Sequence, residues 1–199
     1  SVGGFNTPYI ARLNSDGSRD TTFVDPGFSS VVNQIIPLPD GKFVSTGSFS
    51  TIGGVERLRI ARLNADMTLD ESFDAGLAAP VGVGRGALMP DGKIVIGISG
   101  SSSAGIYRLN TDGAIDNTFT PPTTNASTIS RVVYDEHSNK LYVLGNFTTV
   151  ESGTRRLVMR LNLNGSLDTS FQPVSLGTGT LYHVLPLPDG KLYIAGTAL

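Results

Sequence analysis

Carboxylates are the main side chains in this sequence that could do acid–base or metal chemistry. The 199 residues include 17 Asp and Glu, two His and no Cys. The absence of Cys excludes thiolate nucleophiles and Cys-based zinc or iron–sulfur sites. His137 and His183 form no pair with metal-ligand spacing and belong to no recognisable nucleophile arrangement. These residue types predict no catalytic residue, no metal site and no cofactor.

Three acids stand where a hydrolase could use them: Asp135, Glu136 and Glu151. A glycosidase needs two opposed carboxylates at a defined separation, and neighbours such as Asp135 and Glu136 do not guarantee one. We interpret this pair first as a solvated loop edge. A carbohydrate-active enzyme that uses these acids stays as the alternative.

The segment from Asn14 to Asp20 places oxygen ligands at alternating positions, as a calcium loop does. Its Gly stands at the fourth position rather than the sixth, and the distal bidentate Glu of an EF-hand is missing. An Asp or Asn that caps the backbone of a hairpin turn explains the same residues. We therefore expect turns in this segment and in its repeats.

More than half of the charged residues belong to two repeated motifs, and the first of these occurs four times. Arg-Leu-Asn is followed by Asp eight residues after the Arg and by Phe three residues later, with copies 46 to 52 residues apart. The Arg and Asp of the four copies are Arg12 and Asp20, Arg62 and Asp70, Arg108 and Asp116, and Arg160 and Asp168. A residue needed in every copy is needed by the fold, because one active site would mark one copy only. We expect each Arg to hold its Asp with two hydrogen bonds across a hairpin.

A second motif predicts the elements that position these pairs. Pro-Asp-Gly-Lys occurs at 39–42, 90–93 and 188–191, and it is degraded to His-Ser-Asn-Lys at 137–140. Each motif lies between apolar runs, which is typical of a hairpin. The Gly-rich segment 82–86 fits a close-packed inner strand. The pattern predicts an all-β fold, a β-propeller of four blades with about fifty residues and four strands each.

The two ends of the sequence hold complementary halves of one copy. Paired, residues 1–23 and 172–199 would complete a blade and cover exposed strand edges. We predict one domain over 1–199, with blades at about 24–74, 75–119, 120–171, and 172–199 plus 1–23. The same halves could pair between molecules, or the chain could be part of a longer protein. A monomer, a ring-completing homo-oligomer and a fragment therefore stay open.

These motifs resemble the delta-60 repeats of β-propellers, whose consensus is approximately Arg-Leu-Asn-x-Asp-Gly-x-Leu-Asp-x-x-Phe followed by Pro-Asp-Gly-Lys. This sequence departs from the consensus at Arg19, Met67, Asn164 and the degraded third turn. Such repeats occur in bacterial secreted or surface proteins and in phage tail-associated proteins. The resemblance therefore implies an extracellular, cell-surface or virion location, and it implies no known active site.

The predicted binding surface lies in segments that differ between copies, because a rigid scaffold leaves its loops free to vary. These include the blade-joining segment 121–124 and the loops that carry Arg57, Arg59, Arg155 and Arg156. Such Arg side chains could contact a protein or a surface glycan.

Charge and hydropathy argue against two classes of partner, nucleic acid and a membrane interior. A formal net charge of −2 argues against nucleic acid, and no apolar run is long enough to span a membrane. The favoured function is a non-catalytic structural or binding scaffold for attachment or assembly. The alternative is a carbohydrate-active propeller enzyme or a lectin acting on a surface polysaccharide.

Overall fold

Antiparallel β-strands and turns make up the computed structural model, which describes residues 9–77, 82–100, 104–151, 153–154, 157–173 and 179–197. These ranges contain no helix, so the predicted all-β class is confirmed. It follows that they contain no helix of the length and apolarity that a membrane crossing requires.

The strands form one small sheet for each copy of the repeat. The first sheet has the order β1 (Val32–Pro37), β2 (Phe43–Gly47), β5 (Ile60–Leu63). In the second, β8 (Ile94–Ser99) pairs on one side with β6 (Gly82–Val83) and β7 (Ala87–Leu88) and on the other with β9 (Gly105–Leu109). The third has the order β10 (Ile129–Asp135), β11 (Lys140–Gly145), β14 (Val158–Leu161), and the last pairs β15 (Leu181–Pro186) with β16 (Leu192–Gly196). The predicted inner strand at 82–86 is thus present in part, as β6.

Two copies carry an additional small hairpin between their second and third strands. These hairpins are β3 (Thr51–Ile52) with β4 (Val55–Glu56), and β12 (Thr149–Val150) with β13 (Gly153–Thr154). Both lie in segments predicted to vary between copies. The hairpins project from the sheets and do not extend them.

Each complete sheet ends at its third main strand, and the predicted fourth strand is reduced to a single bridge. The bridges join Leu63 to Leu69, Leu109 to Ile115 and Leu161 to Leu167. Just beyond the first bridge, the Ser72 amide donates to Asp70 Oδ1 at 3.1 Å and the Phe73 amide to the Asp70 carbonyl at 3.3 Å. The Asp-x-x-Phe segment therefore closes on itself as a turn, and its backbone cannot continue the sheet.

The hairpin turns keep their geometry where the sequence departs from the repeat. The glycines of the three intact Pro-Asp-Gly turns, Gly41, Gly92 and Gly190, have φ angles of 83°, 81° and 82°. In the degraded third copy Asn139 takes this conformation with φ 53°, which Asn tolerates better than most side chains. Asp135 accepts hydrogen bonds there from the His137 amide at 3.0 Å and from the Ser138 hydroxyl. The third hairpin forms for this reason.

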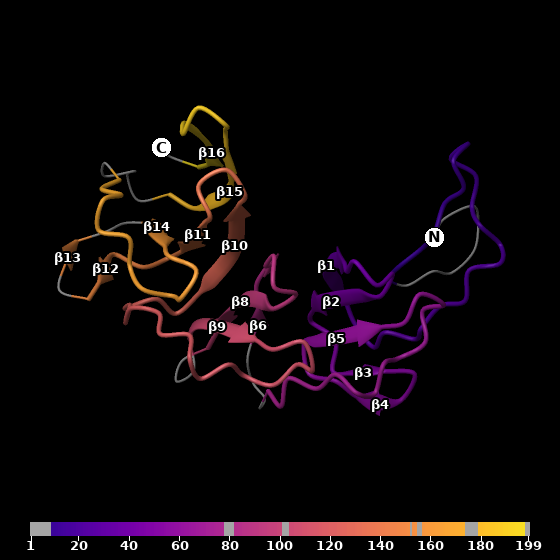
Figure 1. The fold of residues 1–199 in the computed structure, drawn as a ribbon. Helices are drawn as coiled ribbons and strands as arrows, with labels where there is room; N and C mark the ends of the chain where they lie inside the picture. The colour runs from indigo at the N-terminus through magenta and orange to yellow at the C-terminus, as the bar shows by residue number, and fades with distance from the viewer. Residues whose placement is uncertain are drawn as a thin grey trace.

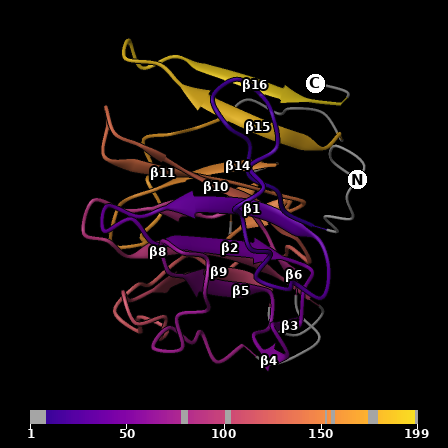
Figure 2. The same ribbon diagram turned by 90° about the vertical axis from the view of Figure 1, so that its right-hand side faces the viewer.

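Adjacent sheets stack (Figure 2), and their buried side chains form shared cores. One core joins Ile36 and Val44 of the first sheet to Ile94 and Ile96 of the second. The next joins Val95 and Ile106 of the second sheet to Val132 and Val143 of the third, and another joins Tyr142 and Val158 of the third to Leu181 and Val184 of the last. Stacking buries the apolar faces that a single sheet would expose to water.

The stacked sheets follow an open arc (Figure 1). Strands β1, β10 and β15 lie on its concave side, whereas the β3–β4 and β12–β13 hairpins lie on its convex side. Residues 9–23 and the β15–β16 sheet lie at opposite ends of the arc. The described residues therefore do not show the predicted closure of the ring.

Candidate functional site

The predicted pairing of Arg with Asp is present in every copy. Arg Nε donates to Asp Oδ2 at 2.7 Å for Arg12 and Asp20, 2.7 Å for Arg62 and Asp70, 2.8 Å for Arg108 and Asp116, and 2.9 Å for Arg160 and Asp168. The Arg108 Nη2 also lies 2.8 Å from Asp116 Oδ2, as expected, and in all four copies Nη2 donates to the hydroxyl two residues after the Asp. In the copy of Asp70, Arg62 Nη2 donates to the Ser72 hydroxyl at 3.1 Å, and this hydroxyl donates to Asp70 Oδ1 at 2.6 Å. The Ser72 hydroxyl therefore bridges Arg62 and the second carboxylate oxygen of Asp70.

In the three complete copies the Lys after the hairpin turn completes the cluster, which the sequence analysis missed. Lys42 donates to Asp70 at 2.6 Å, and Lys93 donates to Asp116 at 2.6 Å. In the third copy Lys140 lies 3.2 Å from Asp168. One buried carboxylate therefore faces two cations in each complete copy.

Two of the repeated Arg side chains also contact the next blade, whereas Arg160 Nη1 donates to the Tyr142 hydroxyl of its own blade at 3.3 Å. Arg62 Nη1 donates to the Thr111 carbonyl, and Arg108 Nη1 donates to the Leu163 carbonyl at 2.8 Å. Each acceptor lies in the corresponding turn of the next copy. The guanidinium groups also lie over the Phe rings of the motif, at 5.0 Å for Phe73 and 4.9 Å for Phe119. These two Arg side chains therefore serve the stacking of blades.

These contacts keep the cluster carboxylates ionised. Burial would raise the pKa of Asp70, but hydrogen bonds from Lys42, Ser72 and Arg62 outweigh it and hold the pKa well below its usual range. For Asp116 the hydrogen bond from Lys93 is the main cause of the lowered pKa. In the first copy the Thr22 hydroxyl and amide lower the pKa of Asp20 to about 2. Carboxylates in this state cannot act as general acids near neutral pH.

The alternating oxygens between Asn14 and Asp20 cap a turn, as expected. Asp16 Oδ1 accepts hydrogen bonds from the Ser18 amide at 2.8 Å and from the Ser18 hydroxyl at 2.6 Å. Asn164 makes the same contacts with Ser166, at 3.0 and 2.8 Å, in the copy that contains Asp168. In the part of the chain that the structure describes, no three His, Asp or Glu side chains gather as metal ligands would.

The acids that an enzyme could use lie at the two ends of the third sheet. Asp135 is buried, pairs with Lys140 in the sheet register and caps the third turn. Glu151 is exposed, and its amide donates to the Thr123 carbonyl at 2.8 Å, beyond the opposite end of β10. Glu136 is exposed beside the third turn. The structure therefore does not bring these carboxylates together.

The predicted binding arginines support loops. Arg57 is only 11% exposed; it donates to the Glu56 carbonyl at 2.8 Å and lies 3.8 Å from Asp74. Arg59 donates to the Ser48 carbonyl from a backbone with φ 69°. Arg155 and Arg156 lie outside the described residues. Arg57 and Arg59 thus have intramolecular partners.

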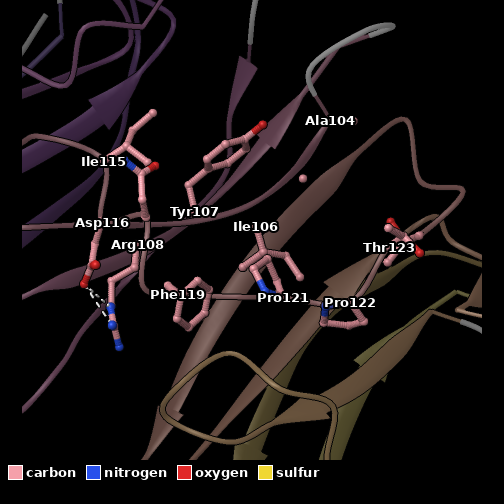
Figure 3. A pocket seen from close by; sticks show the side chains of 13 residues that line it. Ala104, Ile106, Tyr107, Arg108, Ile115, Asp116, Phe119, Pro121, Pro122 and Thr123 are labelled. Carbon is pink, nitrogen blue, oxygen red and sulfur yellow. Dashed lines mark hydrogen bonds and ion pairs between the residues drawn. The ribbon is translucent and has the colours of Figure 1, made fainter.

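A pocket of about 380 Å³ borders the predicted variable segment 121–124 (Figure 3). Tyr107 and Phe119 contribute to its wall together with Pro121 and Pro122. The charged residues in its lining, Arg108 and Asp116, are paired with each other at 2.8 Å. The pocket offers an apolar rim and no unpaired charge.

A second pocket, of about 390 Å³, lies on the inner strands. Its lining includes Arg85 and Arg131 from neighbouring blades and Tyr182 from β15. Sequence reasoning missed these two Arg, although both are among the basic residues that the repeat leaves free. Arg85 stands eight residues before Lys93, and Arg131 stands nine before Lys140, next to the longer third turn. The signal that could have identified Arg85 and Arg131 is their distance of eight or nine residues before the Lys of the hairpin turn.

A search of curated proteins finds no match. Among solved structures, a protein of unknown function from Bacteroides caccae is similar, with 14% identity over 82% of this chain and 70% of that chain and a TM-score of 0.36. The family model described as "Domain of unknown function (DUF5122) beta-propeller" matches residues 1–23, 38–73, 90–119 and 138–171. These segments hold all four Arg-Leu-Asn motifs and cover more than half of the sequence, so the chain belongs to the DUF5122 β-propeller family.

Proposed function

We propose that this chain is a non-catalytic binding and assembly module of a cell surface or a phage virion. The observation that carries the proposal is the use of the repeated charges. In each complete copy an Arg and a Lys pair with one Asp, as Arg62 and Lys42 do with Asp70. In two of these copies the Arg also donates to a backbone carbonyl of the next blade. The repeated charged residues therefore stabilise the blades and their contacts. The positions that vary between copies are left to recognise a partner.

The experiment compares binding with turnover. The purified chain is applied to a glycan array and, in parallel, incubated with a panel of polysaccharides while released reducing sugar is measured. We expect saturable binding to at least one surface glycan or envelope preparation and no released sugar. Sugar release that depends on Asp135 or Glu151 would replace this proposal with the enzyme.

The location is part of the proposal and is supported by the resemblance of the repeats. Antibodies against the chain should label intact cells or purified virions of the source. Labelling only after the cells are lysed would contradict it.

We also propose that residues 9–23 and β15–β16 are two halves of one blade, which gives four blades' worth of repeat in the chain. Each half carries an incomplete cluster. Asp20 pairs with Arg12, whereas Lys191, the counterpart of Lys42, pairs with Asp189 in its own turn at 2.7 Å. Joining the halves would place Lys191 beside Asp20, as Lys42 lies beside Asp70 in a complete copy.

Charge exchange tests this joining. Asp20→Lys and Lys191→Asp should each lower the melting temperature, and the double variant should recover part of the loss. Additive losses in the double variant would count against a shared blade.

A further inference from the structure

The innermost strands present one equivalent position in each blade. Gln34, Arg131 and His183 occupy the same register position of β1, β10 and β15. Arg85 is their counterpart in the second blade, because it precedes Lys93 by eight residues, as Gln34 precedes Lys42. The Gln34 side chain forms two hydrogen bonds with the next blade. Its Oε1 accepts from the Gly86 amide at 2.8 Å, and its Nε2 donates to the Gly86 carbonyl at 3.0 Å. The next two positions, in adjacent blades, are both arginines.

Backbone contacts hold these arginines as neighbours. Arg85 and Arg131 form a parallel bridge between blades, in which the Val132 amide donates to the Arg85 carbonyl at 2.7 Å and the Arg85 amide to the Ser130 carbonyl at 3.0 Å. Both side chains line the pocket of about 390 Å³ on the inner strands. The two cations therefore share a fixed wall of one pocket.

Neither cation has an acidic partner among the described residues, in contrast to the four repeated arginines. Arg131 Nη1 donates to the Tyr182 carbonyl at 3.0 Å, and Arg85 Nε makes a long contact of 3.4 Å to the Asn33 carbonyl. The pocket lining contains no Asp or Glu. Burial and the charge of Arg85 both lower the pKa of Arg131, which means that its cation is under-compensated. An anion in the pocket would relieve this repulsion, and guanidinium groups match oxyanions well.

The rest of the lining is suited to a carbohydrate. Tyr182 is 59% exposed and offers a ring on which a sugar can stack. Asn33, Ser130 and Thr180 add an amide and two hydroxyls. We propose that Arg85 and Arg131 bind the carboxylate of an acidic sugar in this pocket, with Tyr182 beside the sugar ring. This inference rests on the proposed binding function and names its ligand class.

The test uses isothermal titration calorimetry on the full chain with trigalacturonate, neutral galactotriose and inorganic phosphate. We expect saturable binding of trigalacturonate that weakens as NaCl rises, and no saturable binding of galactotriose. Arg85→Gln and Arg131→Gln should each weaken the affinity by at least about tenfold, since each removes charge-assisted hydrogen bonds. Arg19→Gln removes the same charge outside the pocket and should leave the affinity unchanged.

Each other outcome overturns a defined part of the inference. Equal affinity for galactotriose, or binding that Arg19→Gln weakens as much as Arg131→Gln, would exclude the paired arginines as the anion site. Phosphate binding without trigalacturonate binding would exclude the sugar. The salt dependence of the unmodified chain decides the electrostatic part even where a Gln variant fails to fold. Cleavage of trigalacturonate would refute the non-catalytic function while leaving the site in place.

Discussion

At the scale of single residues, the balance between burial and pairing decides what each carboxylate does. Asp70 is 6% exposed and receives donors from Lys42, Arg62 and the Ser72 hydroxyl. Desolvation of a lone carboxylate would be costly, but three donors compensate for it. Acids of this kind are structural, although a lowered pKa in a repeat protein can resemble the signature of an active site.

We predict that Asp70→Asn lowers the free energy of unfolding by about 2 to 4 kcal/mol, because it leaves Lys42 and Arg62 without their counter-charge. Urea denaturation followed by circular dichroism measures this. Asp66→Asn is the control, because exposed Asp66 caps its turn through the Thr68 amide and hydroxyl and lies outside the cluster. Its free energy of unfolding should fall less. An equal or larger fall for Asp66→Asn would show that the contacts with Lys42 and Arg62 add nothing.

The lowered carboxyl pKa values fix the direction of the pH dependence. Asp20 has a pKa of about 2 in the folded chain against 3.8 for an unperturbed Asp, and the pKa of Asp70, Asp116 and Asp168 is also lowered. Their stabilisation is complete above about pH 5 and is lost as the pH falls through 4 toward 2. The melting temperature should be flat from pH 5 to 7 and fall below pH 4, and the fall should be shallower in Asp70→Asn. A variant profile parallel to that of the unmodified chain would contradict the assignment.

At the scale of elements, local patterns were predictable and contacts between distant segments were not. The three main strands of each copy and the turns at Gly41, Gly92 and Gly190 follow from apolar runs and Asp-Gly pairs. The fourth strand was predicted wrongly, because the Asp of Asp-x-x-Phe bonds its own backbone. The contact of Lys42 with Asp70 joins residues 28 apart, and only the register of β2 against β5 reveals it. The pocket arginines come together through pairing between blades, which no single repeat encodes.

One turn position tests the contact between blades. Gly113 has φ 96°, and a Cβ there would lie 2.8 Å from the Asp74 backbone of the preceding copy. Gly41, in the other turn of the repeat, has φ 83° and only the Ala65 Cβ nearby, at an ordinary contact distance of 3.9 Å. We predict that Gly41→Ala costs about 1 kcal/mol from the left-handed backbone, and that Gly113→Ala costs about 1 to 3 kcal/mol more from the clash. Chemical denaturation measures both, and equal costs would mean that the blades separate to admit the methyl group.

At the scale of the whole molecule, the two ends of the arc present the surfaces that complete blades bury. Leu13 is 54% exposed, whereas its counterparts Leu63, Leu109 and Leu161 are fully buried. Tyr193 is 68% exposed, whereas its counterpart Tyr142 is buried under Arg160, whose guanidinium lies 5.9 Å from the Tyr142 ring centroid. In a joined blade, Arg12 would meet Tyr193 in the same way. The half-blades lie at opposite ends of the arc (Figure 1), so a second molecule can supply the missing half without reshaping the stacked core.

We therefore predict that the chain forms a dimer in which each half-blade pairs with the complementary half of the other copy. Light scattering coupled to size-exclusion chromatography should give twice the mass of 20.9 kDa. Deletion of residues 1–23, or Tyr193→Ser, should yield monomers, because either change removes one side of the joint. Tyr182→Ser removes another exposed Tyr ring, from the inner pocket, and should leave the dimer intact. A compact monomer in which Tyr193 is protected from iodination would instead show that the chain bends further and closes on itself.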